Sequence, residues 1–265
     1  MSDVDPTVLG PALAELAEGV ACEAGALLLR HAERPASGLA SKSTHTDLVS
    51  DADRASETLI VSRLREARPD DTIVAEEGTD HAGAEGAVRW LVDPLDGTIN
   101  FLWGIPHWCV SMAAFDAAGA LAGAVRDPNR DETFTAVRGR GSCLNGRPLT
   151  IAAGTELAEA MVGTGFNYSS QVRARQAARM APLVPRARDI RRMGAAALDL
   201  SWVAAGRFDA FYERGVEPWD TAAGALVVRE AGGATVDLHA TDDMPAGIAA
   251  GGAELIEQVL GLVES

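Results

Sequence analysis

The segment WLVDPLDGTINF, residues 90–101, constrains the fold of this chain more than any other stretch. Its first residues, 90–92, are a short apolar run of the kind that forms a buried strand. The run ends in an acidic turn, in which Pro94 restricts φ and Gly97 relieves the backbone. Three polar side chains are therefore expected to be held together at the end of a buried strand: Asp93, Asp96 and Thr98.

Carboxylates held this close beside apolar chain repel one another, and their burial is costly unless a cation or hydrogen-bond donors neutralise them. A divalent cation does this with the fewest groups. The nearby ligands are oxygen atoms, without His or Cys, which favours Mg²⁺ or Mn²⁺ over zinc. A capped Asp-Gly turn at the end of a strand explains the same segment, so both interpretations stay open at this point.

The chain length allows one large domain or two lobes, because 265 residues can bury a substantial core either way. No apolar run approaches the roughly 18 residues that a membrane span requires. The N-terminus, MSDVDPTVLG, lacks a basic region followed by an apolar stretch, so no secretion signal is expected. We therefore expect a soluble, cytoplasmic protein that does not associate with membranes.

The charge balance argues against general affinity for nucleic acids. The formal net charge is −15 and Lys42 is the only lysine, whereas phosphate backbones are bound by clustered basic residues. The arginine-rich segment 173–192 is more typical of an exposed helix and its flank than of a binding patch. The cysteines, Cys22, Cys109 and Cys143, are odd in number and widely spaced, which is typical of reduced core thiols.

Two helices are predicted before the acidic turn. Apolar residues at helical spacing predict a helix over 7–33, which ends before Pro35. After a loop that contains Lys42, Ser50 can cap a second helix, which runs to about residue 67. Asp53 in the first turn of this helix either complements the helix dipole or points a carboxylate into a site.

A short β-prone run at 72–75 is followed by Glu76, Glu77 and Gly78. Adjacent glutamates usually belong to a solvated loop. Here they close a strand just as Asp93 closes the next one. The acidic ends of two successive strands can therefore converge.

The pattern changes near residue 150. Before it, apolar stretches at 107–116, 119–126 and 132–138 alternate with turn signals and predict an antiparallel meander, with His107 in a strand. After it, strands are predicted at 160–164, 187–191, 208–212 and 234–238, and helices at 170–181, 195–205, 219–231 and from about 252. We therefore predict an N-terminal α+β lobe over 1–150 and a C-terminal α/β lobe over 151–265.

Two helix starts in the second half have chemical promise. Gly194, Ala195 and Ala196 open a helix with residues small enough for a ligand to approach the backbone N–H groups, although they also permit close helix packing. Residues 217–220, Glu-Pro-Trp-Asp, open another helix, so Asp220 lies where the helix end favours negative charge. A purely structural cap is an alternative role for Asp220.

Three motifs occur in a fixed order: AEEG at 75–78, DPLDGTINF at 93–101 and WDTAAGALVVREAGG at 219–233. Together they resemble the inositol monophosphatase family of metal-dependent, lithium-sensitive phosphatases. The resemblance covers nearly the whole chain, from the segment 42–53 to Gly233. It implies an α/β (α+β) fold, a layered αβαβα sandwich, usually assembled as a homodimer.

The resemblance assigns the metal ligands. It implies that Glu76 and Asp93, with the Leu95 carbonyl, hold a first Mg²⁺. It also implies that Asp93, Asp96 and Asp220 hold a second ion, and that Glu76, with waters, helps to hold a third. Mn²⁺ is the alternative ion.

The resemblance also assigns catalytic and substrate residues. Thr98 and Asp53 match the pair that orients and deprotonates the nucleophilic water, so with Glu76 they are the expected catalytic residues. The backbone at Gly97 and Thr98, beside Asp96, is expected to face the phosphate. The other substrate positions match a segment that lines the sugar-ring hydroxyls and an acid that hydrogen-bonds to one of them: Gly194, Ala195, Ala196 and Glu213.

The sequence departs from the commonest family pattern at three positions, none of which removes a ligand. Ala75 and Gly78 replace the outer residues of Gly-Glu-Glu-Ser, and Ile99 stands where Thr or Lys is frequent. Gly78 lacks the family hydroxyl, which leaves the support of Glu77 and its loop open.

The expected activity is that of a Mg²⁺-dependent inositol-phosphate phosphatase. Phosphate monoesters hydrolyse very slowly, and clustered metal ions address this by activating water and stabilising the attacking and leaving oxygens. Direct attack by water is implied, since no Cys or His nucleophile is evident. The small phosphorylated polyol is the expected partner, with no nucleic acid.

Other substrates fit the same fold: histidinol phosphate, fructose 1,6-bisphosphate, a dinucleotide phosphate or 3′-phosphoadenosine 5′-phosphate. A nucleotide would call for an aromatic or basic shelf that the sequence does not reveal. The alternative from a different functional class is a regulatory binding protein that keeps the site without its activity. Every ligand position is filled, which favours the enzyme.

Overall fold

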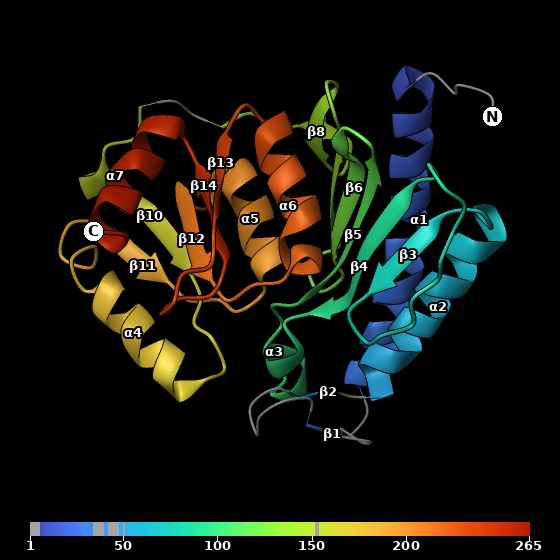
Figure 1. Ribbon diagram of the computed structural model, residues 1–265, viewed down its shortest axis with the longest axis horizontal. Helices are drawn as coiled ribbons and strands as arrows, with labels where there is room; N and C mark the ends of the chain where they lie inside the picture. The colour runs from blue at the N-terminus through green and yellow to red at the C-terminus, as the bar shows by residue number, and fades with distance from the viewer. Residues whose placement is uncertain (1–5, 34–39, 42–47, 50, 152–153) are drawn as a thin grey trace.

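Five alternating layers of helix and sheet make up the chain in the computed structural model, which describes residues 6–33, 40–41, 48–49, 51–151 and 154–265 (Figure 1). From right to left in Figure 1 the layers are α1 (Pro6–Ala32) with α2 (Asp51–Ala67), a seven-stranded sheet, α5 (Ala196–Ala204) with α6 (Pro218–Glu230), a five-stranded sheet, and α4 (Ser170–Met180) with α7 (Ala253–Val263). The predicted αβαβα sandwich is therefore confirmed.

The first sheet has the order β3-β4-β5-β6-β7-β8-β9. Its strands are β3 (Thr72–Ala75), β4 (Arg89–Asp96), β5 (Cys109–Asp116), β6 (Gly119–Asp127), β7 (Glu132–Val137), β8 (Gly141–Leu144) and β9 (Arg147–Pro148). β3 and β4 are parallel and the later pairs are antiparallel, which confirms the predicted meander. The sequence did not predict β8 and β9, because they are short and lie among turn-forming residues.

The second sheet has the order β11-β10-β12-β14-β13. Its strands are β10 (Met161–Thr164), β11 (Asp189–Arg191), β12 (Ala210–Arg214), β13 (Ala234–Leu238) and β14 (Gly247–Gly251). β10 is parallel to both of its neighbours, whereas β14 pairs antiparallel with β12 and β13. The sequence did not predict β14, because four of the residues in GIAAG are glycine or alanine, which are depleted in strands.

Four short elements complete the described chain: β1 (Ala40–Ser41), β2 (Leu48–Val49), α3 (Thr98–Leu102) and the 3₁₀ helix η1 (Leu157–Glu159). α3 was not predicted, because five residues are too few to show a helical period. The predicted cap at Ser50 and the loop residue Lys42 lie outside the described residues. The two sheets lie on either side of residue 150, but α6 packs against strands of both, so the division into two lobes stays a prediction.

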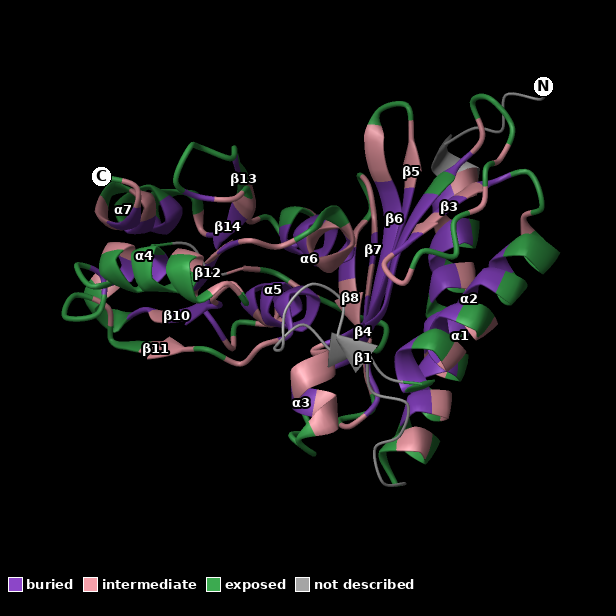
Figure 2. Cartoon of the chain, turned by 60° about the horizontal axis from the view of Figure 1, so that its bottom comes forward, coloured by how far each residue is buried: buried purple, intermediate pink, exposed green. Residues whose placement is uncertain are grey.

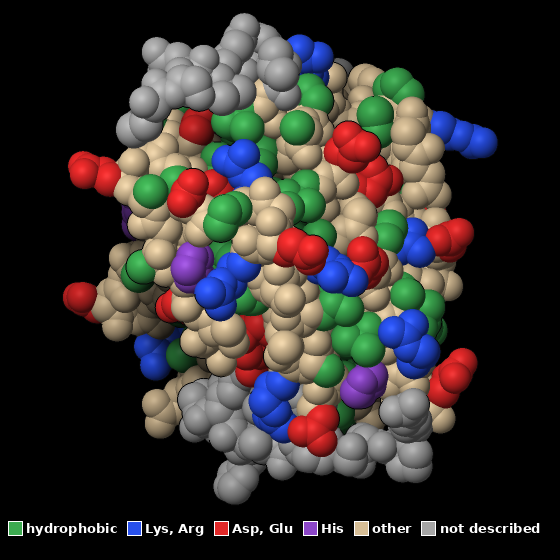
Figure 3. Space-filling model, turned by 90° about the vertical axis from the view of Figure 1, so that its right-hand side faces the viewer, with side chains coloured by type: hydrophobic (Ala, Val, Ile, Leu, Met, Phe, Trp, Pro, Cys, Tyr) green, Lys and Arg blue, Asp and Glu red, His purple; other side chains and the backbone are tan. Residues whose placement is uncertain are grey.

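α1 and α2 cover the outer face of the first sheet with a buried inner side and an exposed outer side (Figure 2). On α1, Leu13, Val20 and Leu28 are at most 3% exposed and recur at helical spacing. The outer surface mixes acidic and basic side chains (Figure 3). On α2, the exposed Arg63 pairs with Glu23 of α1 at 2.9 Å. Such exposed pairs contribute little to stability. Within the described ranges, no helix is both long and apolar enough to cross a membrane.

Close packing of α5 against α6 in the middle layer depends on Gly224. A Cβ at this position would lie 2.7 Å from Leu200 Cβ and 2.9 Å from the Ala197 carbonyl oxygen, so a side chain here would push the helices apart. The packing brings the first turns of both helices close to the end of β4, above α3 in Figure 1.

We expect Gly224→Ala to lower the free energy of unfolding by about 1–3 kcal/mol, because the added methyl group overpacks the contact between α5 and α6. The matched control is Gly261→Ala on α7, where an added Cβ meets nothing within 4 Å. Since alanine favours a helix over glycine by roughly 1 kcal/mol, the control should be neutral or stabilising. Urea unfolding of both variants makes the comparison, and equal effects would contradict the assigned role of Gly224.

Candidate functional site

Three carboxylates from distant parts of the chain meet where β3 and β4 of the first sheet end. Glu76, Asp93 and Asp220 each offer an oxygen atom, and these atoms lie within 4.8 Å of one another. The Glu76 N–H donates a hydrogen bond to the Val92 carbonyl at 3.1 Å, which continues the parallel pairing of β3 and β4. The predicted convergence of two acidic strand ends is therefore confirmed, and α6 adds the third acid.

The acidic turn begins later than the sequence suggested, because β4 continues through Asp96 instead of stopping before Asp93. The pairing of β4 with β5 is irregular between these two residues, where Pro94 has no N–H to donate. Inside this stretch, Asp93 Oδ1 accepts a hydrogen bond from the Leu95 N–H at 2.9 Å. Gly97 follows with φ 93°, a conformation that side chains disfavour, and turns the chain into α3.

Asp96 binds the start of α5. Its carboxylate accepts hydrogen bonds from the N–H groups of Ala196 at 3.2 Å and Ala197 at 2.7 Å. It also accepts one from the Cys109 thiol at 3.5 Å. Of the backbone N–H groups that the sequence left open for a ligand, that of Ala196 is thus used inside the protein, and Asp96 caps a helix that lies a hundred residues away along the chain.

Asp53 and Thr98 are brought together although they belong to different elements. Thr98 Oγ1 lies 3.0 Å from Asp53 Oδ1 and 3.1 Å from the Leu95 carbonyl oxygen, and it can donate its proton to either. Asp53 is fully buried in the first turn of α2. Its side chain is therefore directed at the acidic turn, in addition to any favourable interaction with the helix dipole.

Two further residues of α2 support the site, and sequence reasoning missed both. Ser56 Oγ donates to the Pro94 carbonyl at 2.8 Å. The Glu57 carboxylate accepts hydrogen bonds from the N–H groups of Glu77 at 2.7 Å and Thr79 at 3.0 Å. Glu57 thereby supplies the loop support that Gly78 lacks. A signal was present, because Asp53, Ser56 and Glu57 are polar residues at helical spacing on the side of α2 that also carries its apolar residues.

Asp220 combines the two roles that the sequence offered as alternatives. It lies in the first turn of α6, where its Oδ2 accepts a hydrogen bond from the Glu217 N–H at 2.8 Å, and it also belongs to the acidic cluster. Pro218 starts the helix, as predicted. Ser111 on β5 donates to the Trp219 carbonyl at 3.1 Å, which fixes the start of α6 against the first sheet.

A pocket of about 630 Å³ opens onto these acids. Its wall includes the acidic cluster, the acidic turn, the start of α6 and a segment that the sequence did not single out, residues 167–169. Tyr168 in this segment is 43% exposed. The segment is tied to α4, since the Asn167 N–H donates to Gln176 at 2.8 Å and Arg173 donates to the Tyr168 carbonyl at 3.2 Å. Only the fold brings it to the site.

The residues predicted to bind the sugar ring, Gly194, Ala195, Ala196 and Glu213, lie outside the lining of this pocket. Glu213 on β12 packs so closely against Gly165 that a side chain at position 165 would overlap its carboxylate. Burial raises the pKa of Glu213 to about 8, although nearby Arg192 opposes the rise. The Arg192 guanidinium also lies against Gly194, so these two predicted positions share one cationic neighbour.

Burial and mutual repulsion raise the pKa values of the acids. Burial is the largest cause for Asp93 and Asp220, whose pKa values lie well above the usual range, and neighbouring carboxylates add to it. Burial raises the pKa of Asp96 to about 7, although its hydrogen bond from Ala197 opposes the rise. The cluster therefore holds protons near neutral pH unless a cation replaces them.

The donor set of the cluster fits a hard divalent cation. Among the described residues that form it, every donor is a carboxylate oxygen, and such oxygens are the ligands that Mg²⁺ and Mn²⁺ prefer. The acids are held close together by strand pairing and by the start of α6. A cation between them would remove the repulsion that the pKa values report.

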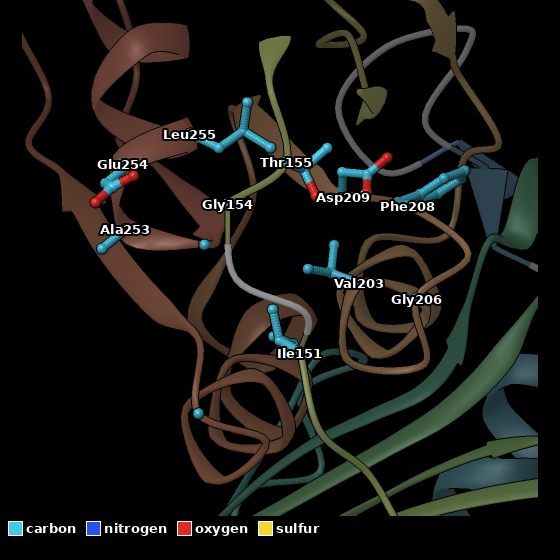
Figure 4. A pocket seen from close by; sticks show the side chains of 12 residues that line it. Ile151, Gly154, Thr155, Val203, Gly206, Phe208, Asp209, Ala253, Glu254 and Leu255 are labelled. Carbon is cyan, nitrogen blue, oxygen red and sulfur yellow. Dashed lines mark hydrogen bonds between the residues drawn. The ribbon is translucent and has the colours of Figure 1, made fainter. Parts of the chain in front are cut away.

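A second pocket, of about 540 Å³, lies between the end of α5 and the start of α7 (Figure 4). Its described lining includes two acids, Asp209 and Glu254. Asp209 is committed to the fold, because its Oδ2 accepts a hydrogen bond from the Met161 N–H at 2.8 Å. We therefore assign the functional site to the pocket at the acidic cluster.

Comparisons with known proteins agree with this geometry. The model of the inositol monophosphatase family matches residues 12–264. Nus factor SuhB of Salmonella typhimurium is 38% identical over 248 residues, 92% of this chain and 93% of that protein. Inositol-1-monophosphatase of Rhizobium meliloti is 46% identical over 195 residues, 73% of each chain. The crystal structure of extragenic suppressor protein suhB from Bartonella henselae matches with a TM-score of 0.88 and 34% identity, over 96% of this chain and 99% of that one.

We expect Mg²⁺ to raise the melting temperature, and to raise it more at pH 8 than at pH 6. An acid whose pKa is raised by folding destabilises the folded state as pH rises from its unfolded pKa, about 4, to its folded pKa, which is about 7 for Asp96. A bound cation neutralises the repulsion among ionised carboxylates. More of these carboxylates are ionised at pH 8 than at pH 6, so the cation stabilises the folded state more at pH 8. Thermal unfolding with Mg²⁺ and with EDTA at both pH values tests this, and a shift that is equal at both would contradict it.

We expect Glu57→Gln to loosen the Glu76 loop, because an amide nitrogen cannot accept one of the two N–H bonds that the carboxylate accepts. A hydrogen bond to a charged group is worth about 1.5–3 kcal/mol, so the free energy of unfolding should fall by an amount in this range. Urea unfolding measures it. Glu66→Gln, at an exposed position on the same helix, is the matched control and should change little.

Proposed function

The chain belongs to the inositol monophosphatase family, and on this premise we propose that it hydrolyses inositol monophosphate to inositol and phosphate with Mg²⁺ as its cofactor. Members of this family are metal-dependent phosphatases. The observation that carries the proposal is the cluster of Glu76, Asp93 and Asp220 at one pocket, with the hydrogen bond between Asp53 and Thr98 beside it.

Two to three Mg²⁺ ions would be held by side-chain and carbonyl oxygens of one group of residues: Glu76, Asp93, Leu95, Asp96 and Asp220. When bound, the ions supply Lewis acids that polarise the phosphoryl oxygens and lower the pKa of water. Asp96 already accepts two backbone hydrogen bonds, but an ionised carboxylate has about four acceptor sites. It can therefore keep its contact with α5 and still bind a cation.

Asp53 and Thr98 would activate the attacking water. When the Thr98 hydroxyl donates its proton to Asp53, its oxygen lone pairs can accept a hydrogen bond from water. That hydrogen bond orients the water toward the phosphorus atom, and Thr98 can relay the proton to Asp53 as the water attacks. Attack is direct, and the leaving alkoxide takes up a proton from solvent, while Asp53 returns the proton that it received from the water to solvent.

The polyol contacts are assigned to Glu213, Gly194, Ala195 and Ala196 on the family resemblance, since these residues lie outside the described lining of the pocket. The carboxyl group of Glu213 can hydrogen-bond to a ring hydroxyl. The phosphate would lie against the backbone of Gly97 and Thr98, next to Asp96. A site built for hydroxyl contacts discriminates against ligands that leave its polar groups unpaired.

Tyr168 supports a second candidate substrate class, the nucleotides. It is an aromatic residue in the lining of the pocket, the kind of shelf that the sequence did not reveal. Stacking of a base on an aromatic side chain is worth roughly 1–3 kcal/mol. A nucleoside phosphate could therefore compete with a polyol phosphate.

A regulatory role is the alternative from a different class, since the Salmonella typhimurium relative is named Nus factor SuhB. The enzyme is favoured because each predicted ligand position carries an oxygen donor. A cytoplasmic location, homodimeric assembly and sensitivity to lithium belong to the same proposal.

The proposed function is tested by phosphate release from a panel of esters: inositol 1-phosphate, histidinol phosphate, fructose 1,6-bisphosphate and 3′-phosphoadenosine 5′-phosphate. Activity should require Mg²⁺ or Mn²⁺ and vanish with EDTA. Asp93→Asn should lose it as well, because Asp93 is expected to bridge two ions. Near-normal turnover by Asp93→Asn at ordinary Mg²⁺ would show that the metal assignment is wrong.

We expect Thr98→Ala and Asp53→Asn each to lower kcat by about 10²-fold or more, the scale of general-base assistance, with less effect on KM. Steady-state kinetics at saturating Mg²⁺ measure both constants. Thermal unfolding is the control. If Asp53→Asn lowers the melting temperature but leaves kcat unchanged, the role of Asp53 is structural and not catalytic.

We expect Glu213→Gln to reduce kcat/KM for inositol 1-phosphate by at most about tenfold, the upper end of what one neutral hydrogen bond contributes, because a carboxyl group whose pKa is about 8 is mostly protonated near neutral pH. The nucleotide ester should be affected less. Tyr168→Ala is the matched variant. It should reduce kcat/KM more for the nucleotide ester than for inositol 1-phosphate, since it removes the aromatic surface. A preference for the nucleotide or for histidinol phosphate that Glu213→Gln leaves unchanged would exclude inositol phosphate as the substrate.

A further inference from the structure

A fully buried polar pair lies behind the site. His107 Nε2 and Asp199 Oδ1 share a hydrogen bond of 2.9 Å, and their side chains are 2% and 1% exposed. His107 precedes β5, so the prediction that it lies in a strand is wrong. Asp199 belongs to the first turn of α5. The pair therefore ties the entry of β5 to the same helix that Asp96 caps.

A second tie runs parallel to the first. The Asn100 side-chain nitrogen donates to the His107 carbonyl at 2.7 Å and to the Met193 carbonyl at 2.8 Å. Met193 directly precedes the segment that leads into α5. Two sets of hydrogen bonds, made by His107 with Asp199 and by Asn100, thus hold the start of α5 against the chain between β4 and β5.

The pair is costly to the fold, which argues that it is kept for more than stability. Both groups lose their hydration, and His107 Nδ1 lacks a hydrogen-bond partner in the part of the chain that the structure describes. Burial raises the pKa of Asp199 well above its usual range, although the Gly194 N–H and nearby Arg192 oppose the rise. Apolar residues of similar volume often replace buried ionisable pairs without loss of stability. Trp202 already packs edge-to-face on His107 at 4.9 Å, so an apolar ring would fit this environment.

We propose that His107 and Asp199, assisted by Asn100, are positioning residues that set the start of α5 against Asp96 and thereby tune the affinity of the acidic site for Mg²⁺. The chain of contacts is short. The pair fixes the first turn of α5, the Ala196 and Ala197 N–H groups fix the Asp96 carboxylate, and Asp96 is an expected metal ligand. The inference rests on the proposed metal site.

The main test is the double variant His107→Phe/Asp199→Leu, which removes both polar groups and keeps the volume apolar. Mg²⁺ binding is measured by calorimetry and by the Mg²⁺-induced shift in melting temperature. Loss of a direct hydrogen-bonding partner of a ligand weakens metal affinity by about 10–100-fold. The pair acts on Asp96 one contact further away, through the start of α5, so we expect a loss at the lower end of this range, about tenfold. At saturating Mg²⁺, kcat should remain close to that of the wild type, because Asp53 and Thr98 are not touched.

Two single variants sharpen the comparison. Asp199→Asn keeps a hydrogen bond to His107 through its amide and should keep the wild-type Mg²⁺ affinity. Asp71→Asn is the matched control, because Asp71 is a buried acid that accepts a hydrogen bond from Trp90 Nε1 at 2.9 Å at the opposite end of β3. It should lower stability without changing Mg²⁺ affinity.

Every outcome of these measurements either supports or overturns the proposed role of the His107–Asp199 pair. Wild-type Mg²⁺ affinity in a folded double variant overturns the proposal, and so does a loss in Asp199→Asn as large as in the double variant. If the double variant does not fold, Asn100→Leu replaces it: weakened Mg²⁺ binding supports the proposal and unchanged binding overturns it. A wild-type protein that binds Mg²⁺ but releases no phosphate would refute the proposed function alone, while one that binds no Mg²⁺ would refute both.

Discussion

The burial of acidic side chains at the end of β4 is the constraint on which the rest of this structure depends. Asp93 and Asp96 are 2% and 8% exposed, and both lose most of their hydration. The fold compensates by placing acids of the site at helix N-termini. Asp53 lies in the first turn of α2, Asp96 accepts two N–H groups at the start of α5, and Asp220 lies in the first turn of α6. Each such arrangement favours negative charge by about 0.3–1 kcal/mol or more when partly buried.

This constraint explains why the middle layer is packed so closely. α5 and α6 come from the second half of the chain, yet their first turns must reach an acidic turn that belongs to the first half. Ser111 binds the carbonyl of Trp219 and Asn100 binds that of Met193, so polar contacts join the two halves around the site. Neither half contains the whole acidic cluster, and its chemistry requires the complete sandwich.

Elements with a clear hydrophobic period could be predicted from the sequence. The strand at Thr72–Ala75 and the meander strands agree with their predicted positions, because their alternation of apolar residues and turns is local. β14 could not be predicted, since its glycine and alanine residues form a strand only through pairing with β12 and β13. His107 was misplaced for a related reason: its apolar neighbours suggested a strand, whereas its polar partner lies 92 residues further along the chain.

By itself, the sequence determined which residues carry charge at strand and helix ends, and so predicted the convergence of Glu76 with Asp93. The layered fold was implied by the resemblance of three motifs to the inositol monophosphatase family. Spacing and composition are properties of short segments, and the positions of charges at strand and helix ends depend on such segments. Only the tertiary structure decided how each charge is satisfied: that Asp96 caps α5, that Glu57 supports the loop at Glu77, and that Tyr168 lines the pocket. These contacts join residues far apart in the chain, and their geometry is fixed by packing of the layers, which no local pattern records.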